Sequence, residues 1–352
     1  MVTRRKFIQS FSMLAAGLGT YRPLFGFFSF NSFPCFDLHA HPGIFFAKGS
    51  DQYPGDAAVM KTLTEMKDGN VAGTFLSLVA DARIIKVSPD GVRPFGNFAK
   101  GEAWMDYKRQ LGLVREVLQN SLHVVMATEK DSFDKNPAKV SAFISIEGGD
   151  YLEGDAGRLE EMYNDGIRSI QLVHYHPNEL GDLQTEVPQH NGLSPAGKEA
   201  VKRMNKLGML VDVAHASYET TKAVADVTTH PIMLSHSMLY NGSQHPVAKR
   251  MLSPDHARAV ADTGGIIGMW PSGLNASLSD FVDNTMRLID VVGIDHVGLG
   301  TDMDANFRPV LSSYLEVGQW LNGLQSKGLN ENETAKIAGG NARRVLNQVL
   351  RS

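Results

Sequence analysis

The chain has 352 residues, of which 43% are hydrophobic and 20% are charged, as in an ordinary globular protein. Its formal net charge of −4 and pI near 6.3 give no reason to expect a polyanionic partner, so nucleic-acid binding is not expected. Cys35 is the single cysteine, so no internal disulfide can form and cysteine usage does not indicate a redox compartment.

The first 34 residues differ from the rest of the chain. Arg4 and Arg5 stand together before Phe7 and a modest apolar run with small residues, a pattern typical of a twin-arginine export signal. The apolar run is too short to span a bilayer, and no later stretch reaches that length. The residues SFPC, which end at Cys35, make a poor lipoprotein box. We therefore expect residues 1–34 to be an export signal and the protein to be periplasmic without a lipid anchor. A chance Arg-Arg pair is the alternative.

Residues 35–352 show no break in composition and predict a single domain, in which short β-rich runs alternate with amphipathic stretches. Near-continuous apolar strands separated by helices are typical of a parallel sheet covered on both faces. Eight such strands predict an α/β fold of the (β/α)8 TIM-barrel type. A doubly wound sheet is the alternative, but no glycine-rich phosphate loop follows the first strand. The predicted strands are 36–41, 71–79, 140–147, 167–174, 209–215, 231–236, 264–270 and 296–302.

The segments between the predicted strands are expected to form the outer layer of the barrel. Residues 48–101 are predicted to be a long, loop-rich segment that contains the second strand. The C-terminal tail is predicted to form two short helices that pack on the barrel. Helices are predicted at 102–120, 195–207, 217–226, 254–262 and 279–292.

Six of the eight predicted strands end in a metal-ligating side chain. One histidine that closes a strand is usually just hydrogen-bonded, but six such ends are hard to ascribe to chance. In a barrel these carboxyl ends meet at one mouth, where catalytic residues collect. Imidazole and carboxylate groups suit zinc and similar divalent ions, so the mouth is predicted to hold metal. The residues are His39 and His41, Glu147, His174, His215, His236 and Asp302.

The number of candidate ligands predicts two ions. One open catalytic site needs about three protein ligands and a water, and the set here exceeds that. Two ions roughly 3.5 Å apart, bridged by one carboxylate, would use it fully. Glu147 is the natural bridge, because two glycines follow it in SIEGG and let the backbone approach closely.

Five segments occur in order along the chain: SIEGGDY, SIQLVHYHPNELGD, LVDVAHAS, PIMLSHS and DHVGLGTDMD. Together they resemble the membrane dipeptidase (renal dipeptidase) family of binuclear zinc peptidases. The resemblance implies that His39 and His41 bind one zinc, that His215 and His236 bind the other, and that Glu147 bridges them.

The resemblance also implies roles for the residues around the ions. It assigns His174 to the scissile carbonyl, Asp302 to proton handling and Arg250 to the substrate carboxylate. The family usually has His-x-Asp at the first strand, whereas this chain has His39-Ala40-His41. A neutral ligand in place of an anionic one raises the net charge of the site by one unit, which should make bound water more acidic and could change metal preference.

These inferences lead to one main functional hypothesis and two rivals. The main one is an exported zinc dipeptidase that splits dipeptides, including those with a C-terminal D-residue, by attack of a hydroxide held between the ions. The first rival is another binuclear amidohydrolase, such as a lactonase, phosphotriesterase, esterase or amidase, which His-x-His favours slightly. The second is a metal-binding or peptide-binding relative without turnover. A small peptide is the expected partner, and a homodimer is left open.

Several other polar residues are expected to be structural. His123, His230 and His256 are among the histidines placed at strand starts or on helices, away from the mouth. Asp37 and Asp212 lie within predicted strands and are expected to hydrogen-bond a ligand or the backbone rather than touch metal. His296 belongs with the first group, while His176 and Asn178 follow His174 closely enough to leave substrate contact open.

Overall fold

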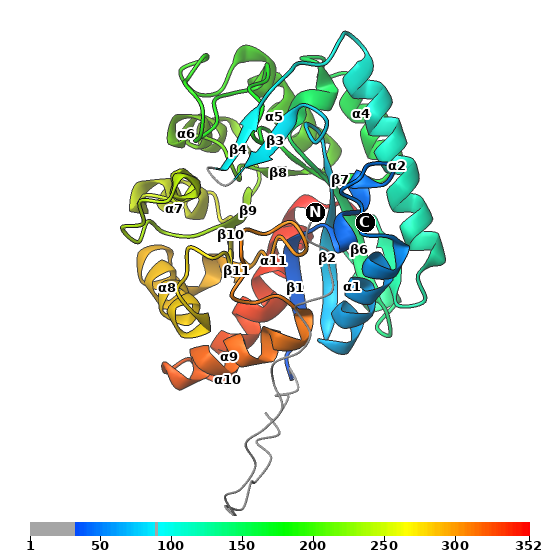
Figure 1. The fold of residues 1–352 in the computed structure, drawn as a ribbon. Helices are drawn as coiled ribbons and strands as arrows, with labels where there is room; N and C mark the ends of the chain where they lie inside the picture. The colour runs from blue at the N-terminus through cyan, green and yellow to red at the C-terminus, as the bar shows by residue number, and fades with distance from the viewer. Residues whose placement is uncertain (1–31, 89–90) are drawn as a thin grey trace, which may run out of the picture.

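The structure is a computed structural model that describes residues 32–88 and 91–352. Eight parallel strands close into a barrel with helices around it, which confirms the predicted (β/α)8 fold (Figure 1). The ring closes where β2 pairs with β6 in continuous register from Gly73↔Ser141 to Val79↔Glu147. The barrel strands are β1 (Cys35–Ala40), β2 (Val71–Val79), β6 (Val140–Glu147), β7 (Ile167–Gln171), β8 (Leu210–Asp212), β9 (Met233–Ser237), β10 (Ile266–Met269) and β11 (Val297–Leu299).

Helices form the outer layer, and side-chain caps fix where several of them begin. Ser194, Ser217, Ser253 and Ser277 each accept a hydrogen bond from the backbone amide three residues later, which satisfies a donor that the first turn leaves free. The helices are α1 (Asp56–Asp68), α2 (Glu102–Asn120), α3 (Ser132–Lys135), α4 (Arg158–Asn164), α5 (Pro195–Leu207), α6 (Tyr218–Val227), α7 (Pro254–Ala261), α8 (Leu278–Val292), α9 (Val317–Ser326), α10 (Glu331–Ala335) and α11 (Asn341–Val349).

The region predicted as a loop-rich excursion contains more structure than expected. Besides α1, it holds an antiparallel hairpin of β3 (Ile85–Ser88) and β4 (Gly91–Pro94). Both strands are short and carry partly or fully exposed side chains, so no alternating apolar pattern marked them. A further short strand, β5 (Val124–Ala127), pairs with the first half of β6. Sequence analysis missed these three strands.

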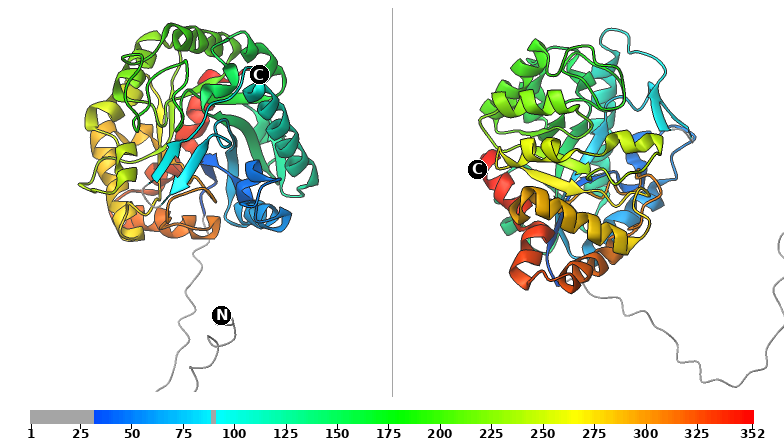
Figure 2. Two further views of the ribbon diagram at one scale, coloured as in Figure 1. Left: turned by 45° about the horizontal axis from the view of Figure 1, so that its top comes forward. Right: turned by 90° about the vertical axis from the view of Figure 1, so that its left-hand side faces the viewer.

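The two ends of the barrel differ in character. At the end opposite the hairpin, α11 packs against the barrel interior, as the predicted C-terminal helices should (Figure 2). Val345, Leu346 and Val349 of α11 share one buried cluster with Phe36 and Phe143 of the strands. This apolar plug excludes water from that end. The polar residues of the barrel are therefore left to the mouth, at the carboxyl ends of the strands.

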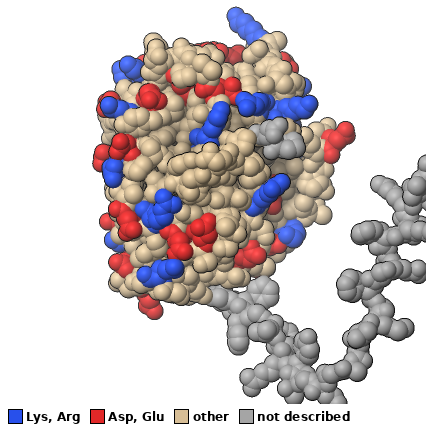
Figure 3. Space-filling view, turned by 60° about the vertical axis from the view of Figure 1, so that its left-hand side comes forward, with Lys and Arg blue, Asp and Glu red and all other residues tan. Residues whose placement is uncertain are grey.

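The face of the molecule seen in Figure 3 shows no strong separation of charge. Basic and acidic side chains are interspersed over the face seen in Figure 3. Across the two described ranges, no helix has both the length and the apolar character that a bilayer crossing requires. Most of the predicted export signal, residues 1–31, lies outside the described part of the chain.

His256 is a buried residue of α7, and its lowered pKa predicts that the folded protein loses stability in acid. Its Nε2 lies 2.8 Å from Oγ1 of Thr221, and burial lowers its pKa from 6.5 to about 4. Because the folded pKa lies below the unfolded one, this contribution to stability is complete above pH 6.5 and is lost as the pH falls toward 4. Urea unfolding should show a loss of about 2 kcal/mol from this group at pH 5 relative to pH 7.5.

A matched variant separates this effect from the titration of other groups. His256→Gln cannot titrate, so its stability should fall by about 2 kcal/mol less than that of the parent protein between the same two pH values. Equal losses in the two proteins would show that His256 does not titrate in this way.

Candidate metal centre

Glu147, the last residue of β6, is the centre of the candidate site. Its carboxylate is buried, and five histidine side chains turn their Nε2 atoms toward it. Oε1 lies 3.3 Å from Nε2 of His39, His174 and His215 and 3.7 Å from Nε2 of His236, while Oε2 lies 3.2 Å from Nε2 of His41. The five histidines come from four different strand ends. The barrel therefore places the sequence-predicted ligands within one small volume.

The histidines approach one another in two pairs. Nε2 of His39 lies 2.9 Å from Nε2 of His41, and Nε2 of His215 lies 3.1 Å from Nε2 of His236. Ring nitrogens that face each other and a carboxylate at such distances suit cations, which all of them can ligate through lone pairs. Three overlapping groups of ligand atoms each lie within 4.8 Å: His39, Glu147 and His236; His39, His41 and Asp302; Glu147, His174 and His215. The residues fit a divalent metal centre.

The electrostatics of the histidines agree with such a centre. Burial lowers the pKa of His215 and of His236 well below the usual value, so both rings are neutral and offer a lone pair. Burial opposes protonation of His39 as well, but the carboxylate of Glu147 outweighs it and raises the pKa of His39 to about 9. The centre thus attracts positive charge, and a metal ion would displace the proton from His39.

Asp302 lies just beyond β11, with Oδ1 3.5 Å from Nε2 of His41. Burial raises its pKa to about 6, which suits a group that takes up and releases a proton near neutral pH. Its backbone has a φ of 54°, an uncommon value for a residue other than glycine. The preceding residue, Thr301, donates its amide and hydroxyl to Asp37 of β1, which ties this segment to the first strand.

His174 is held by a carboxylate that sequence analysis did not single out. Its Nδ1 lies 2.6 Å from Oδ1 of Asp81, which is buried just after β2. The other oxygen of Asp81 accepts the backbone amides of Tyr175 and His176. Asp81 therefore fixes the His174 ring with Nε2 turned toward Glu147. The clue available in the sequence was an acidic residue two positions after the predicted strand 71–79.

Three residues of the candidate site lie farther from their strands than predicted. His174, His215 and Asp302 were expected to end strands, but β7, β8 and β11 each end three residues earlier. The prediction of these strand ends was wrong because the chain leaves the sheet before the ligand. His215 has a φ of 66°, so it adopts a left-handed turn that aims its ring at Glu147. Asp212 supports this turn by accepting the amides of Ala214 and Ser235.

Arg250 lies at the C-terminal end of a short 3-10 turn, Pro246–Arg250, and is only 1% exposed. Its guanidinium donates at 3.4 Å to the hydroxyl of Tyr175 and to the carbonyl of His236 and lies 5.4 Å from the ring of Trp270. Within the described residues, Nε has no hydrogen-bond partner and no carboxylate lies within 4 Å of the group. A buried cation without an anion is poised to bind one.

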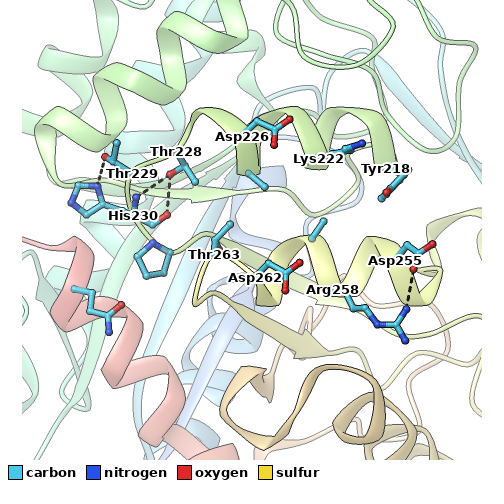
Figure 4. A pocket seen from close by; sticks show the side chains of 14 residues that line it. Tyr218, Lys222, Asp226, Thr228, Thr229, His230, Asp255, Arg258, Asp262 and Thr263 are labelled. Atoms are coloured by element: carbon cyan, nitrogen blue, oxygen red, sulfur yellow. Dashed lines mark hydrogen bonds and ion pairs between the residues drawn. The ribbon is translucent and has the colours of Figure 1, made fainter.

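Other residues near the mouth are occupied by structural contacts. His176 places Nδ1 2.6 Å from Oδ1 of Asp150, and Asn178 donates to the other oxygen of Asp150 at 3.3 Å. Both side chains, for which substrate contact was left open, are hydrogen-bonded to Asp150. A groove of about 700 Å³ lies on the outer wall between α6 and α7, where Lys222, Asp226 and Arg258 are among its lining residues (Figure 4). No residue of the metal centre lines it.

The fold and the histidine cluster define a metal-dependent hydrolase barrel. Comparison with known proteins narrows this class, because residues 30–351 match the model of the family described as membrane dipeptidase (Peptidase family M19). The chain belongs to the membrane dipeptidase family.

Individual relatives are consistent with this family. The dipeptidase aclJ of Aspergillus oryzae is 33% identical over 229 residues, which are 62% of this chain and 54% of that protein. The uncharacterized dipeptidase C3A11.10c of Schizosaccharomyces pombe is 27% identical over 90% of this chain and 81% of its own length. A solved metallopeptidase of Rhodobacter sphaeroides, liganded with a phosphinate mimic of L-Ala-D-Ala, has the same fold with a TM-score of 0.77. It is 19% identical, and the match covers 90% of this chain and 99% of that one.

Variants of His41 test how the candidate ligands are divided between the two proposed metal ions. If His215, His236 and Glu147 bind one ion and His39 and His41 the other, as the resemblance implies, His41→Ala should reduce bound metal from about two ions per chain to about one. His41→Asp should keep both ions, since a carboxylate oxygen binds zinc at about 2.0–2.2 Å, close to the distance of an imidazole nitrogen. Elemental analysis of the purified variants gives the count. Two ions in His41→Ala would mean that His41 is packed protein and not a ligand.

Proposed function

We propose that this protein is a zinc dipeptidase with two ions at the barrel mouth. The observation that carries the proposal is the convergence of five imidazole nitrogens on the buried carboxylate of Glu147, next to the unpaired guanidinium of Arg250. Imidazole-rich sites favour zinc among the common divalent ions, although geometry and availability also select the metal. When bound, the two ions supply a nucleophilic water near neutral pH.

The side chains around the centre have complementary tasks in this proposal. His174, with its ring fixed by Asp81, contacts the carbonyl oxygen of the scissile bond. Asp302 accepts a proton from the attacking water and delivers it to the leaving amine, a task that its buried position beside His41 supports. Arg250 binds the C-terminal carboxylate through parallel hydrogen bonds. One buried cation at one end of the site selects short peptides with a free C-terminus.

We further propose that the second residue of the substrate can have the D configuration. The Rhodobacter sphaeroides metallopeptidase, which shares this fold, was solved with a mimic of L-Ala-D-Ala. The match to the dipeptidase aclJ of Aspergillus oryzae covers 54% of that protein's length.

A panel of substrates tests the proposal. Protein loaded with zinc, cobalt or manganese should hydrolyse L-Ala-D-Ala and L-Ala-L-Ala, and the chelated protein should not. The rival hydrolase class is favoured by the His39-Ala40-His41 motif, so lactones and simple esters belong in the same panel. Turnover of these far above turnover of any dipeptide would favour the rival. Absence of dipeptide hydrolysis with all three metals would refute the dipeptidase.

We also propose that the protein is exported through the twin-arginine route and acts in the periplasm. The paired Arg4 and Arg5 support this, because such a pair is an address that a receptor reads. Replacing both residues by lysine should retain the protein in the cytoplasm while leaving metal binding and turnover unchanged. Fractionation of cells that express the two forms measures the effect. Equal periplasmic amounts of both forms would show that the pair is not an export signal.

A further inference from the structure

A second, smaller cavity lies beside the metal centre and has a distinct chemical character. It has a volume of about 30 Å³ and is lined by the hairpin residues Gly91, Val92 and Arg93 and by Tyr175, Thr185, Pro246, Val247, Lys249 and Arg250. A cavity of this size holds one or two small polar groups, since one water needs about 10–15 Å³. A bulky apolar side chain does not fit without displacing the hairpin.

The charges that line this cavity all have the same sign. Arg93, Lys249 and Arg250 contribute three cations, and no acidic residue is among the described residues that line it. Lys249 has no carboxylate within 4 Å in the described ranges. Arg93 has only a loose, largely exposed contact with Glu186, at 3.8 Å. A chain with an overall negative charge thus presents a small, positively charged cavity next to its metal centre.

The position of the cavity relates it to the substrate. Tyr175 and Arg250 line it, the ring of Tyr175 lies 4.8 Å from the ring of His215, and Arg250 contacts the carbonyl of His236. In the proposed function Arg250 binds the C-terminal carboxylate. The side chain that starts from the same carbon as that carboxylate must then lie close by, within reach of the flanking cations.

We propose that this cavity is a subsite for an acidic side chain, and that the preferred substrates are dipeptides with aspartate or glutamate as the second residue. The inference rests on the proposed dipeptidase function and specifies its substrate class. Arg250 takes the main-chain carboxylate, and Lys249 and Arg93 attract the side-chain carboxylate. Both are largely exposed, so each contributes a modest and salt-sensitive attraction.

Matched pairs of substrates measure this preference. The value of kcat/KM for Ala-Asp should exceed that for its neutral isostere Ala-Asn by about 10-fold, mainly through KM, with the second residue tested in both configurations. Lys249→Ala and Arg93→Ala should each reduce the ratio of kcat/KM for Ala-Asp to that for Ala-Asn by about 2- to 5-fold. Lys249→Glu should bring the ratio to one or below.

Lys86 provides a matched control for nonspecific charge. It lies directly across the hairpin from Arg93 but does not line the cavity. Lys86→Ala should therefore leave the Ala-Asp to Ala-Asn ratio unchanged if the effect is local. An equal decrease in Lys86→Ala, or equal kcat/KM values for the two substrates in the parent protein, would overturn the acidic subsite alone. Absence of hydrolysis for every dipeptide would overturn the proposed function and this inference with it.

Discussion

Replacing Glu147 by glutamine is expected to disrupt the binuclear centre and to lower the activity by about 10³-fold. The amide has nearly the same shape but no charge, so the five histidine rings would face each other without the anion that they now surround. Loss of one bridging ligand should remove about 4 kcal/mol of transition-state stabilisation, which corresponds to about 10³-fold in rate. Kinetics on L-Ala-D-Ala measures the loss, and elemental analysis should show fewer than two ions per chain.

A second readout separates loss of metal from misfolding. The parent protein should unfold at a higher temperature when zinc is present, because a ligand that binds only the folded state stabilises it. Glu147→Gln should unfold cooperatively without metal and gain much less from zinc. A variant that binds two ions with unchanged stabilisation would contradict the role of Glu147 as the bridge.

Removing the charge of Arg250 is expected to have the second-largest effect on kcat/KM. The size of this effect should depend on whether the substrate has a free C-terminal carboxylate. Truncating one partner of a buried charge pair costs about 2–5 kcal/mol, so Arg250→Ala should lower kcat/KM for a free dipeptide by about 30- to 5,000-fold. Metal content should stay near that of the parent protein, because Arg250 lies outside the three groups of candidate ligands.

The dipeptide amide is the matched control for this prediction. It has no terminal carboxylate, so the parent protein should hydrolyse it far less well than the free acid. In Arg250→Ala, kcat/KM should be almost the same for the free dipeptide and its amide. Arg250→Lys should show an intermediate preference for the free dipeptide, since a lysine keeps the charge but lacks the planar guanidinium that forms two parallel hydrogen bonds. If Arg250→Ala still discriminated between acid and amide as the parent does, another group would have to bind the carboxylate.

The barrel and the convergence of the candidate ligands were predictable because both leave local signals in the sequence. Buried parallel strands are continuous apolar runs, and the limits predicted for β2 and β6 are those of the structure. The predicted limits of α2 and α5 also agree, because amphipathic spacing and a capping serine mark α5. The clustering of the candidate ligands was predicted because each follows an apolar run, and the barrel topology brings such positions to one mouth.

The supporting contacts were not predictable because they join distant parts of the chain. Asp81 and His174 are 93 residues apart, and nothing in the sequence around either indicates the other. The same holds for Asp37, whose carboxylate holds Thr301. The left-handed backbone of His215 and Asp302 could not be anticipated either, since neither residue is a glycine. Short, exposed strands such as β3 and β4 lack the apolar pattern on which strand prediction depends.

The dependence of hydrolysis on bound metal tests the central claim most directly. Metal-free protein is titrated with zinc, and the rate of L-Ala-D-Ala hydrolysis and the amount of bound zinc are measured at each step. The account predicts that the rate rises to its maximum as the second ion binds, with about two zinc ions per chain at the plateau. A maximal rate at one ion per chain, or a chain that binds two ions and hydrolyses no dipeptide, would contradict it.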